Sequence, residues 1–443
     1  MKTLKRISAS SLVAVCTIAM SPTALEATEP ATIVVDDDRL QCPDADLDTI
    51  SAAVASAKPG DTVQVCPGVY PEVVQIDRPL TLAGTPGVEA FDCFGTAPSQ
   101  AGDLDPTTYA VLTRPPGIEG NLLTVASAGV TVTGMVLEGA LGEPVDSIYD
   151  AALHLLSGTA GARVHHNLIR RNSLGIDLGS DGSATTRVDH NCLRDNQFGM
   201  ASQRQDFVGG VVENNNTFRN TILAYEVGWP RASTRQSLFA HNVSRQDRIT
   251  FTVSNSWNVS IADNDIEPAS TGVQPASGNT NIRITGNRIF GGTTAGVAFS
   301  ATAGPTSQKA LVAGNDISGF GRTPTGGIGI AVATNAAGVP SIDGVKVMDN
   351  VLSHNAVGIS VQLNNLGVQV HGNTSNDNRQ FGIRAQFLFG TASSASFKDN
   401  VMLGNGSPNL VPSADAFDNN RPANTWAGNV CERDIPIGTI CQS

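Results

Sequence analysis

Five ionisable residues that could carry acid and base chemistry lie in one stretch of the chain: His154, Asp177, Arg204, Asp206 and Glu226. His154 lies in Ala152-Leu-His-Leu155 and Asp177 in Gly175-Ile-Asp-Leu178. The alternation predicts two short strands that turn their leucines and isoleucine inward and His154 and Asp177 outward. Carboxylates crowded near one cation can take acid and base roles on a glycosidic bond, because crowding drives their pKa values apart.

Side chains suited to holding a sugar occur in the same stretch. Aromatic rings can stack on sugar faces, and the candidate substrate-binding residues are Gln203, Tyr225, Trp229 and Arg231. Later segments in the same register present mainly neutral residues: Thr250, Thr252, Gln274, Ala298 and Ser360. We therefore predict a substrate groove over residues 150–231. The competing interpretation is a solvated polar face whose ion pairs add little stability.

A repeat of the form apolar-x-x-Asn-x-apolar organises the chain around these residues. It runs from Val164-His-His-Asn167-Leu-Ile169 to Trp426-Ala-Gly-Asn429-Val-Cys431. The two asparagines are 262 residues and ten intervals apart, or about 26 residues per repeat. Such a period is typical of a solenoid. Each repeat also contains a second strand, often opened by glycine and an apolar residue, so stacked repeats predict three parallel sheets in about 11–12 coils.

The repeated asparagine has a structural explanation. It lies between two short strands, where the backbone turns sharply and asparagine tolerates a positive φ. Its amide both donates and accepts, so stacked copies can bond to one another as an Asn ladder along the axis. A row of ligand-binding amides is the less favoured alternative. We expect the ladder to be structural.

The N-terminal part of the mature chain predicts a cap and the first coils. Residues 46–57 have apolar side chains at helical spacing and end at Lys58-Pro59-Gly60. Strands are predicted at 62–65, 73–76 and 80–83. Residues 85–120 are rich in proline, glycine and aspartate and are interpreted as an ordered insertion. A short amphipathic helix in front of a solenoid would cover the open end of its core.

These segments resemble a known family. Residues 49–76, followed by Leu80-Thr-Leu-Ala-Gly84, resemble the N-terminal cap and first coil of right-handed parallel β-helix repeat proteins of the pectin-lyase-like superfamily. The asparagine repeats resemble the same proteins from about residue 130 to 430. The resemblance implies an all-β, right-handed parallel β-helix with a short capping helix. It implies little about activity, because the superfamily includes lyases, hydrolases, epimerases, copper-site accessory proteins and surface proteins.

The motifs of the superfamily's enzymes are mostly missing. The only run of aspartates that could match the hydrolases is Asp36-Asp37-Asp38, which precedes the helix. The nearest match to the lyase arginine motif, Arg322-Thr-Pro-Thr-Gly-Gly327, lacks the second arginine, and the Asp-Pro-His of epimerases is absent. We predict no resident cofactor and no metal; calcium, which lyase carboxylates bind, has no recognisable motif here.

Histidine and methionine are scarce. The chain has 7 His and 6 Met, which argues against a copper site built from clustered imidazole or sulfur ligands. His165 and His166 precede a ladder asparagine and are interpreted as turn residues rather than ligands.

The first residues have the pattern of a secretory signal peptide, predicted as 1–27, with Lys2, Lys5 and Arg6 before a short apolar run. A lipoprotein box at Cys16 is the less favoured alternative, because Val15 stands where a small residue is wanted. No later segment is apolar enough to span a membrane. We divide the remainder into a cap with first coils (28–129), a β-helix (130–430) and a C-terminal cap (431–443).

Charge and cysteines fit an exported protein. The formal charge of −12, less a net +2 in the signal segment, leaves about −14 on the mature chain, which opposes nucleic-acid binding. It also weakly opposes a polyanionic partner, although a local basic groove could overrule the global sign. An even number of mature cysteines predicts disulfides. The preferred pairs are Cys42–Cys66 and Cys431–Cys441, which leaves Cys93–Cys192.

The sequence therefore predicts a secreted, monomeric β-helix that binds or modifies an extracellular polysaccharide, as a lyase, hydrolase or epimerase would. The alternative is a non-catalytic cell-surface or matrix protein whose long flank serves adhesion. Clustering of His154, Asp177, Asp206 and Glu226 would favour the first interpretation, and dispersal on a flat face the second.

Overall fold

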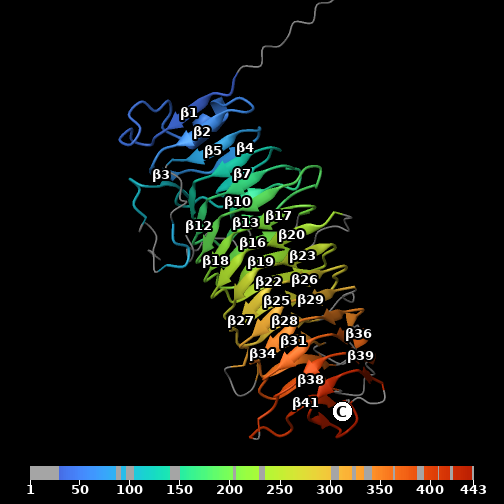
Figure 1. The fold of residues 1–443 in the computed structure, drawn as a ribbon. Helices are drawn as coiled ribbons and strands as arrows, with labels where there is room; N and C mark the ends of the chain where they lie inside the picture. The colour runs from blue at the N-terminus through green and yellow to red at the C-terminus, as the bar shows by residue number, and fades with distance from the viewer. Residues whose placement is uncertain are drawn as a thin grey trace, which may run out of the picture.

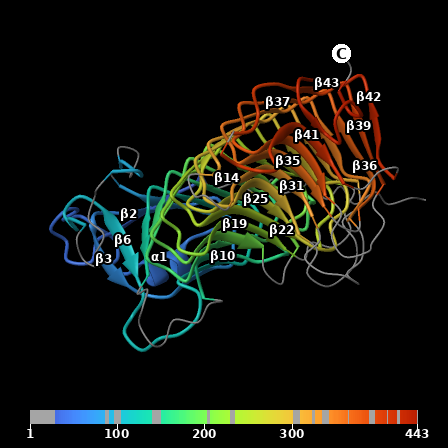
Figure 2. The ribbon, with the colours of Figure 1, turned by 90° about the horizontal axis from the view of Figure 1, so that it is seen from below.

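The structure is a computed structural model that describes residues 29–85, 91–95, 104–139, 150–202, 206–228, 235–300, 309–321, 326–333, 342–362, 365–386, 394–407, 409–419 and 423–441. Within these ranges the chain winds into one solenoid of three parallel sheets, stacked from the N-terminal to the C-terminal coils (Figures 1 and 2). The predicted signal peptide lies outside the described residues.

Sheet A has sixteen strands, fifteen of which form one path. In spatial order they are β1 (Thr32–Val35), β2 (Thr62–Val65), β5 (Thr81–Gly84), β8 (Thr131–Thr133), β11 (Arg163–His165), β14 (Arg187–Asp189), β17 (Val211–Glu213), β20 (Ser237–Ala240), β23 (Val259–Ala262), β26 (Arg283–Thr285), β29 (Leu311–Ala313), β33 (Lys346–Met348), β36 (Asn365–His371), β39 (Ser394–Lys398) and β42 (Thr425–Ala427), with β32 (Ile342–Asp343) paired to β36.

Sheet B has fourteen strands. They are β3 (Gly68–Pro71), β6 (Ala110–Thr113), β9 (Val136–Glu138), β12 (Leu168–Arg170), β15 (Cys192–Arg194), β18 (Asn216–Phe218), β21 (Val243–Arg245), β24 (Asp265–Glu267), β27 (Arg288–Phe290), β30 (Asp316–Ser318), β34 (Val351–Ser353), β37 (Thr374–Asn376), β40 (Val401–Met402) and β43 (Val430–Cys431).

Sheet C also has fourteen strands, and it contains the predicted strands that open with glycine and an apolar residue. They are β4 (Val74–Ile76), β7 (Leu123–Val125), β10 (Ala151–Leu155), β13 (Leu174–Asp177), β16 (Phe198–Ser202), β19 (Leu223–Gly228), β22 (Ile249–Ser254), β25 (Thr271–Pro275), β28 (Ala295–Phe299), β31 (Ile328–Val332), β35 (Val357–Gln362), β38 (Phe381–Gln386), β41 (Ala414–Asp418) and β44 (Asp434–Ile435).

The solenoid has more coils than the predicted 11–12, because its first coils contain strands without the asparagine motif. The predicted insertion at 85–120 contains strand β6, which pairs with β3 and β9, so that prediction was wrong for residues 110–113. Strands β1 and β3 were also not foreseen. Among the described residues, no helix is long and apolar enough to cross a membrane.

The capping helix is shorter than predicted. Helix α1 covers Ile50–Ser56 and buries Ile50, Ala53 and Val54 against the core. Thr49 accepts from Ala52 N, and the carboxylate of Glu72 accepts from the backbone N–H groups of Ile50 and Ser51. These bonds satisfy N–H groups of the first turn that have no partner within the helix. Residues 46 and 47 instead bond to strand β1.

The predicted Asn ladder lies at the turn between sheets A and B. The Oδ1 of Asn191 accepts from both the backbone N (3.1 Å) and the Nδ2 (3.0 Å) of Asn167. The same pair of bonds repeats through the buried residues Asn215, Asn242, Asn264, Asn287, Asn315, Asn350, Asn373, Asn400 and Asn429. The positive φ was assigned to the wrong residue, because it belongs to the residue before each asparagine, such as His166 (φ 54°).

A second ladder, which was not predicted, lies at the turn between sheets B and C. It runs in two segments, Asn172–Asn196–Asn220 and Asn355–Asn378–Asn405. Each segment ends on an aspartate, Asp247 in the first and Asp415 in the second, whose Oδ1 accepts both bonds. In each segment three asparagines are thus followed by one aspartate as the last structural acceptor.

The three predicted disulfides are all present, joining Cys42 to Cys66, Cys93 to Cys192 and Cys431 to Cys441. The first joins residues on either side of α1 and the third closes a loop at the C-terminal end. The second ties the chain near residue 93 to strand β15 of sheet B.

Candidate functional site

The predicted groove residues belong to one row of positions on sheet C that point away from the core. Strand pairing places these positions side by side from coil to coil. This outward row consists of Gln75, Thr124, His154, Asp177, Ala201, Glu226, Thr252, Gln274, Ala298, Ala331, Ser360, Arg384, Phe417 and Ile435. On either side of each position, core residues such as Leu153 and Leu155 point inward.

His154 and Asp177 form the central contact of the N-terminal part of this row. Their strands β10 and β13 pair directly, and His154 Nδ1 lies 2.8 Å from Asp177 Oδ2. The His154 side chain is 18% exposed and that of Asp177 is 9% exposed. Within the described residues, the other carboxylate oxygen of Asp177, Oδ1, is buried and has no hydrogen-bond partner. A buried acceptor of this kind retains the capacity to bind a further donor.

Glu226 lies two strands further along the same row. Asp177 pairs with Ala201, and Ala201 pairs with Glu226, so the two carboxylates are separated by one small residue. Two inter-strand steps place their backbones about 10 Å apart. Asp206 lies outside the row, after β16, where its backbone oxygen accepts from Ser180 N. Gln203, Arg204, Trp229 and Arg231 lie outside the described residues.

The prediction that Tyr225 binds substrate was wrong. Tyr225 is completely buried, and its ring stacks on that of Phe251 at 4.5 Å between centroids. Because Glu226 takes the outward position in β19, Tyr225 must take the adjacent inward one, in register with Met200 and Phe251. The aromatic side chain therefore fills the core instead of facing a ligand.

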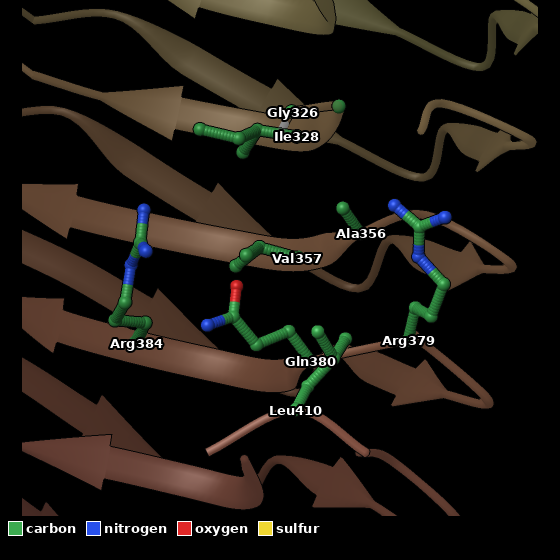
Figure 3. Close-up of a pocket in the computed structure, with 9 residues that line it drawn as sticks. Gly326, Ile328, Ala356, Val357, Arg379, Gln380, Arg384 and Leu410 are labelled. Atoms are coloured by element: carbon green, nitrogen blue, oxygen red, sulfur yellow. The ribbon is translucent and has the colours of Figure 1, made fainter. Parts of the chain in front are cut away.

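The structure also contains a pocket in the C-terminal coils, where few ionisable residues were predicted on the outward row. It encloses about 260 Å³ on the outer side of sheet C, next to β31, β35 and β38. Figure 3 shows Arg384 and Arg379 on opposite sides, with Gln380 and Leu410 between them. The segment Gly382-Ile-Arg-Ala385 has the same register as Gly175-Ile-Asp-Leu178, so alternation alone could have identified Arg384 as an outward residue.

Sheet A carries a third group of ionisable residues. His166 and His190 stack at 5.0 Å between ring centroids, and His165 Nδ1 lies 2.7 Å from His166 Nδ1. Burial lowers the pKa of His165, which favours its neutral form. Asp189 accepts from Arg163 and contacts His190 beside a surface hollow of about 530 Å³. The charges of this group are thus balanced locally.

Solved structures share this fold. A PL6 family alginate lyase is similar with a TM-score of 0.51 and 14% identity, over 87% of this chain and 53% of that one. The chain is a right-handed parallel β-helix. The β-helix is also similar to the catalytic unit of a GH87 α-1,3-glucanase from Streptomyces thermodiastaticus (TM-score 0.49, 13% identity, 87% and 66% covered) and to a DFA-IIIase from Arthrobacter chlorophenolicus (0.42, 16%, 85% and 90%).

One family profile also matches part of the β-helix. The family described as periplasmic copper-binding protein (NosD) matches residues 118–302, which is less than half of the chain. The matched part includes the His154–Asp177 pair and the histidines of sheet A but ends before the Arg384 pocket. No curated protein sequence matches the chain.

Proposed function

We propose that this chain is an exported protein that binds an extracellular polysaccharide along the outward row of sheet C and modifies it at His154 and Asp177. The observation that carries the proposal is the 2.8 Å contact between His154 Nδ1 and Asp177 Oδ2 on the outer side of the sheet. The three disulfides support export, because such bonds persist in oxidising compartments.

The pair has the chemistry of an oriented general base. When His154 donates from Nδ1 to Asp177, the other ring nitrogen, Nε2, carries the lone pair and can accept a proton. Asp177 holds the ring orientation and stabilises the imidazolium that forms. The buried Oδ1 of Asp177 offers a second acceptor to a sugar hydroxyl or a water molecule.

Glu226 supplies the second carboxylate of the proposed site. The backbones of Asp177 and Glu226 are about 10 Å apart, which allows both carboxylates to act on one glycosidic bond. Ala201, which separates them, has the smallest side chain in this part of the row and is buried. Cleavage of a glycosidic bond by acid and base catalysis is therefore the reaction class that we assign to these residues.

Copper binding, which the description of the matching family suggests, does not fit the histidines of sheet A. In the described part of the chain, three potential ligand atoms lie within 4.8 Å of one another in only two groups, and neither contains a histidine. One group is Asp36 with Cys42 and Cys66, whose sulfurs are joined in a disulfide. The other is Asp36 with Asp37 and Asp38. We therefore assign no metal chemistry to the histidine group.

Incubating the purified mature chain with a panel of polysaccharides tests the proposal. Both new reducing ends and unsaturated products are measured, so that hydrolysis and lyase chemistry are distinguished. We expect the wild-type chain to turn over one of the polysaccharides and the His154→Ala variant to lose this activity. Binding without any product would instead support the non-catalytic adhesion role, and activity that His154→Ala leaves intact would place the chemistry elsewhere.

A further inference from the structure

Arg384 is a cation on the outward row without a balancing carboxylate. Its Nε and Nη2 donate to the hydroxyl of Ser360, at 3.3 and 3.1 Å, and its guanidinium lies 5.8 Å from the ring of Phe381. The described residues provide it with no ion pair. Burial, with no contribution from a neighbouring charge, lowers the pKa of Arg384, yet a guanidinium stays protonated in proteins. The pocket therefore holds a positive charge that the fold itself does not neutralise.

The nearby acidic residues are engaged elsewhere. Asp415 accepts from Asn405 and from the backbone N–H groups of Glu432 and Arg433. Asp418 accepts from Asn424 and Trp426. The chain segments between residues 300 and 423 that the structure does not describe contain neither Asp nor Glu in their sequence. No carboxylate from these segments can therefore neutralise Arg384.

The rest of the pocket has the composition of a small-molecule site. Ile328, Val357 and Leu410 contribute apolar surface, and Gln380 lies in the space between Arg379 and Arg384 (Figure 3). Gln380 donates to Pro412 O at 3.3 Å, which holds its amide at the rim. A mostly apolar concavity with a few fixed polar groups is typical of ligand sites. A guanidinium at its edge selects an anion, and its planar fork matches a carboxylate.

We propose that this pocket is an anion-binding site in which Arg384 receives the carboxylate of a sugar acid, either a single uronic acid or one residue of an acidic oligosaccharide. The site does not depend on the chemistry proposed for His154 and Asp177. Eight strand steps separate Arg384 from Asp177 along sheet C, which corresponds to about 38 Å. The two sites can therefore be disrupted separately. A local positive charge also overrides the acidic charge of the chain as a whole.

Isothermal titration calorimetry of the mature chain tests the site with three probes: glucuronate, trigalacturonate and the neutral cellotriose. At least one acid is expected to bind, less tightly as salt increases, while cellotriose does not bind in the pocket. Binding of glucuronate as tight as that of trigalacturonate would identify a single-carboxylate site, and preference for trigalacturonate would identify an oligosaccharide site. Both results support the proposal, whereas binding of neither acid overturns it.

Two pocket variants and two controls locate the binding. Arg384→Gln should weaken binding of the acid at least tenfold, the expected loss for a charge-assisted hydrogen bond. Arg283→Gln, which removes the same charge from an exposed position on sheet A, and Asp177→Asn should leave binding unchanged. Gln380→Glu places a carboxylate in the pocket and should abolish binding without lowering the melting temperature, so that lost binding is not confused with unfolding. Wild-type affinity in Arg384→Gln or in folded Gln380→Glu, or lost binding in Asp177→Asn, overturns the proposal.

Discussion

The outward row of sheet C carries opposite electrostatic arrangements at its two ends. In the N-terminal coils, His154 contacts Asp177, and Glu226 follows two strands later. In the C-terminal coils, Arg384 has only the hydroxyl of Ser360 as a hydrogen-bond partner among the described residues. The scaffold and register are the same in both regions. The two regions differ in whether a neighbouring coil supplies a group of opposite charge. The N-terminal region, where one does, is suited to proton transfer, and the C-terminal region is suited to holding an anion.

The largest effect is expected from the carboxylates of the N-terminal region. Asp177→Asn and Glu226→Gln should each lower turnover of a polysaccharide substrate by about 10²- to 10⁴-fold, because the first removes the carboxylate that orients His154 and the second removes a candidate acid or base. Thermal denaturation should show little change, because both substitutions preserve shape. Arg384→Gln, measured in the same assay, provides the comparison and should retain the chemical step. Full activity in both carboxylate variants would remove the distinction between the two regions.

The two ends of the solenoid should also differ in how much their disulfides stabilise it. Cys42–Cys66 closes a separation of 24 residues and Cys431–Cys441 one of 10 residues. In the chain-entropy model, replacing the first pair by serine costs about 3 kcal/mol, and replacing the second costs somewhat less. Urea denaturation of the two double variants measures the order. Peptide mapping that found Cys42 and Cys66 as free thiols in the exported protein would contradict the pairing itself.

Asp247, which ends the first segment of the second ladder, should make stability depend on pH. Burial raises the pKa of Asp247 to about 6, above its ordinary value of 3.8. The native state then favours the protonated acid, so the stability from this group is complete below about pH 4 and is lost as the pH rises through 6. Two pKa units correspond to about 3 kcal/mol. Asp247→Asn should flatten the dependence of stability on pH between 4 and 7.

Asp415→Asn should lower the stability of the protein more than Asp247→Asn does at pH 7. The Oδ2 of Asp247 accepts from the hydroxyls of Thr217 and Ser244, which can reorient to accept from an amide. The Oδ2 of Asp415 instead accepts from the backbone N–H groups of Glu432 and Arg433. In Asp415→Asn the amide N–H₂ group would face these two N–H donors, and none of them could accept a hydrogen bond. Denaturation curves at pH 7 should show Asp415→Asn as the less stable variant. Equal stability of the two variants would contradict the assigned bonding.

The smallest effect is expected from a ladder residue between the two regions. Asn287 makes bonds to Asn264 and Asn315, so Asn287→Ala leaves buried groups without partners at a cost of about 1 to 3 kcal/mol. Differential scanning calorimetry should show a lower melting temperature, with unchanged function at both ends of sheet C. An unchanged melting temperature would mean that the ladder is not a structural device.

Much of the site could be predicted from alternation along single strands. The pairing of His154 with Asp177 followed from two short segments, because outward positions in adjacent coils lie one strand spacing apart. The same rule misassigned Tyr225, since an outward role was given to both Tyr225 and Glu226 although neighbours in a strand face opposite sides. It would have identified Arg384 had the C-terminal segments been compared in the same register.

The sequence by itself determined the solenoid, its sheets, the first ladder and the disulfides Cys42–Cys66 and Cys431–Cys441, because each arises from a local pattern that repeats or from cysteines close together in the chain. Only the tertiary structure decided which charges are matched. The pocket joins residues of three coils, Ile328, Val357 and Arg384, and the second ladder joins asparagines with aspartates that share no sequence motif. Such features depend on which side chains of neighbouring coils contact one another. The spacing of residues within a single coil does not specify these contacts.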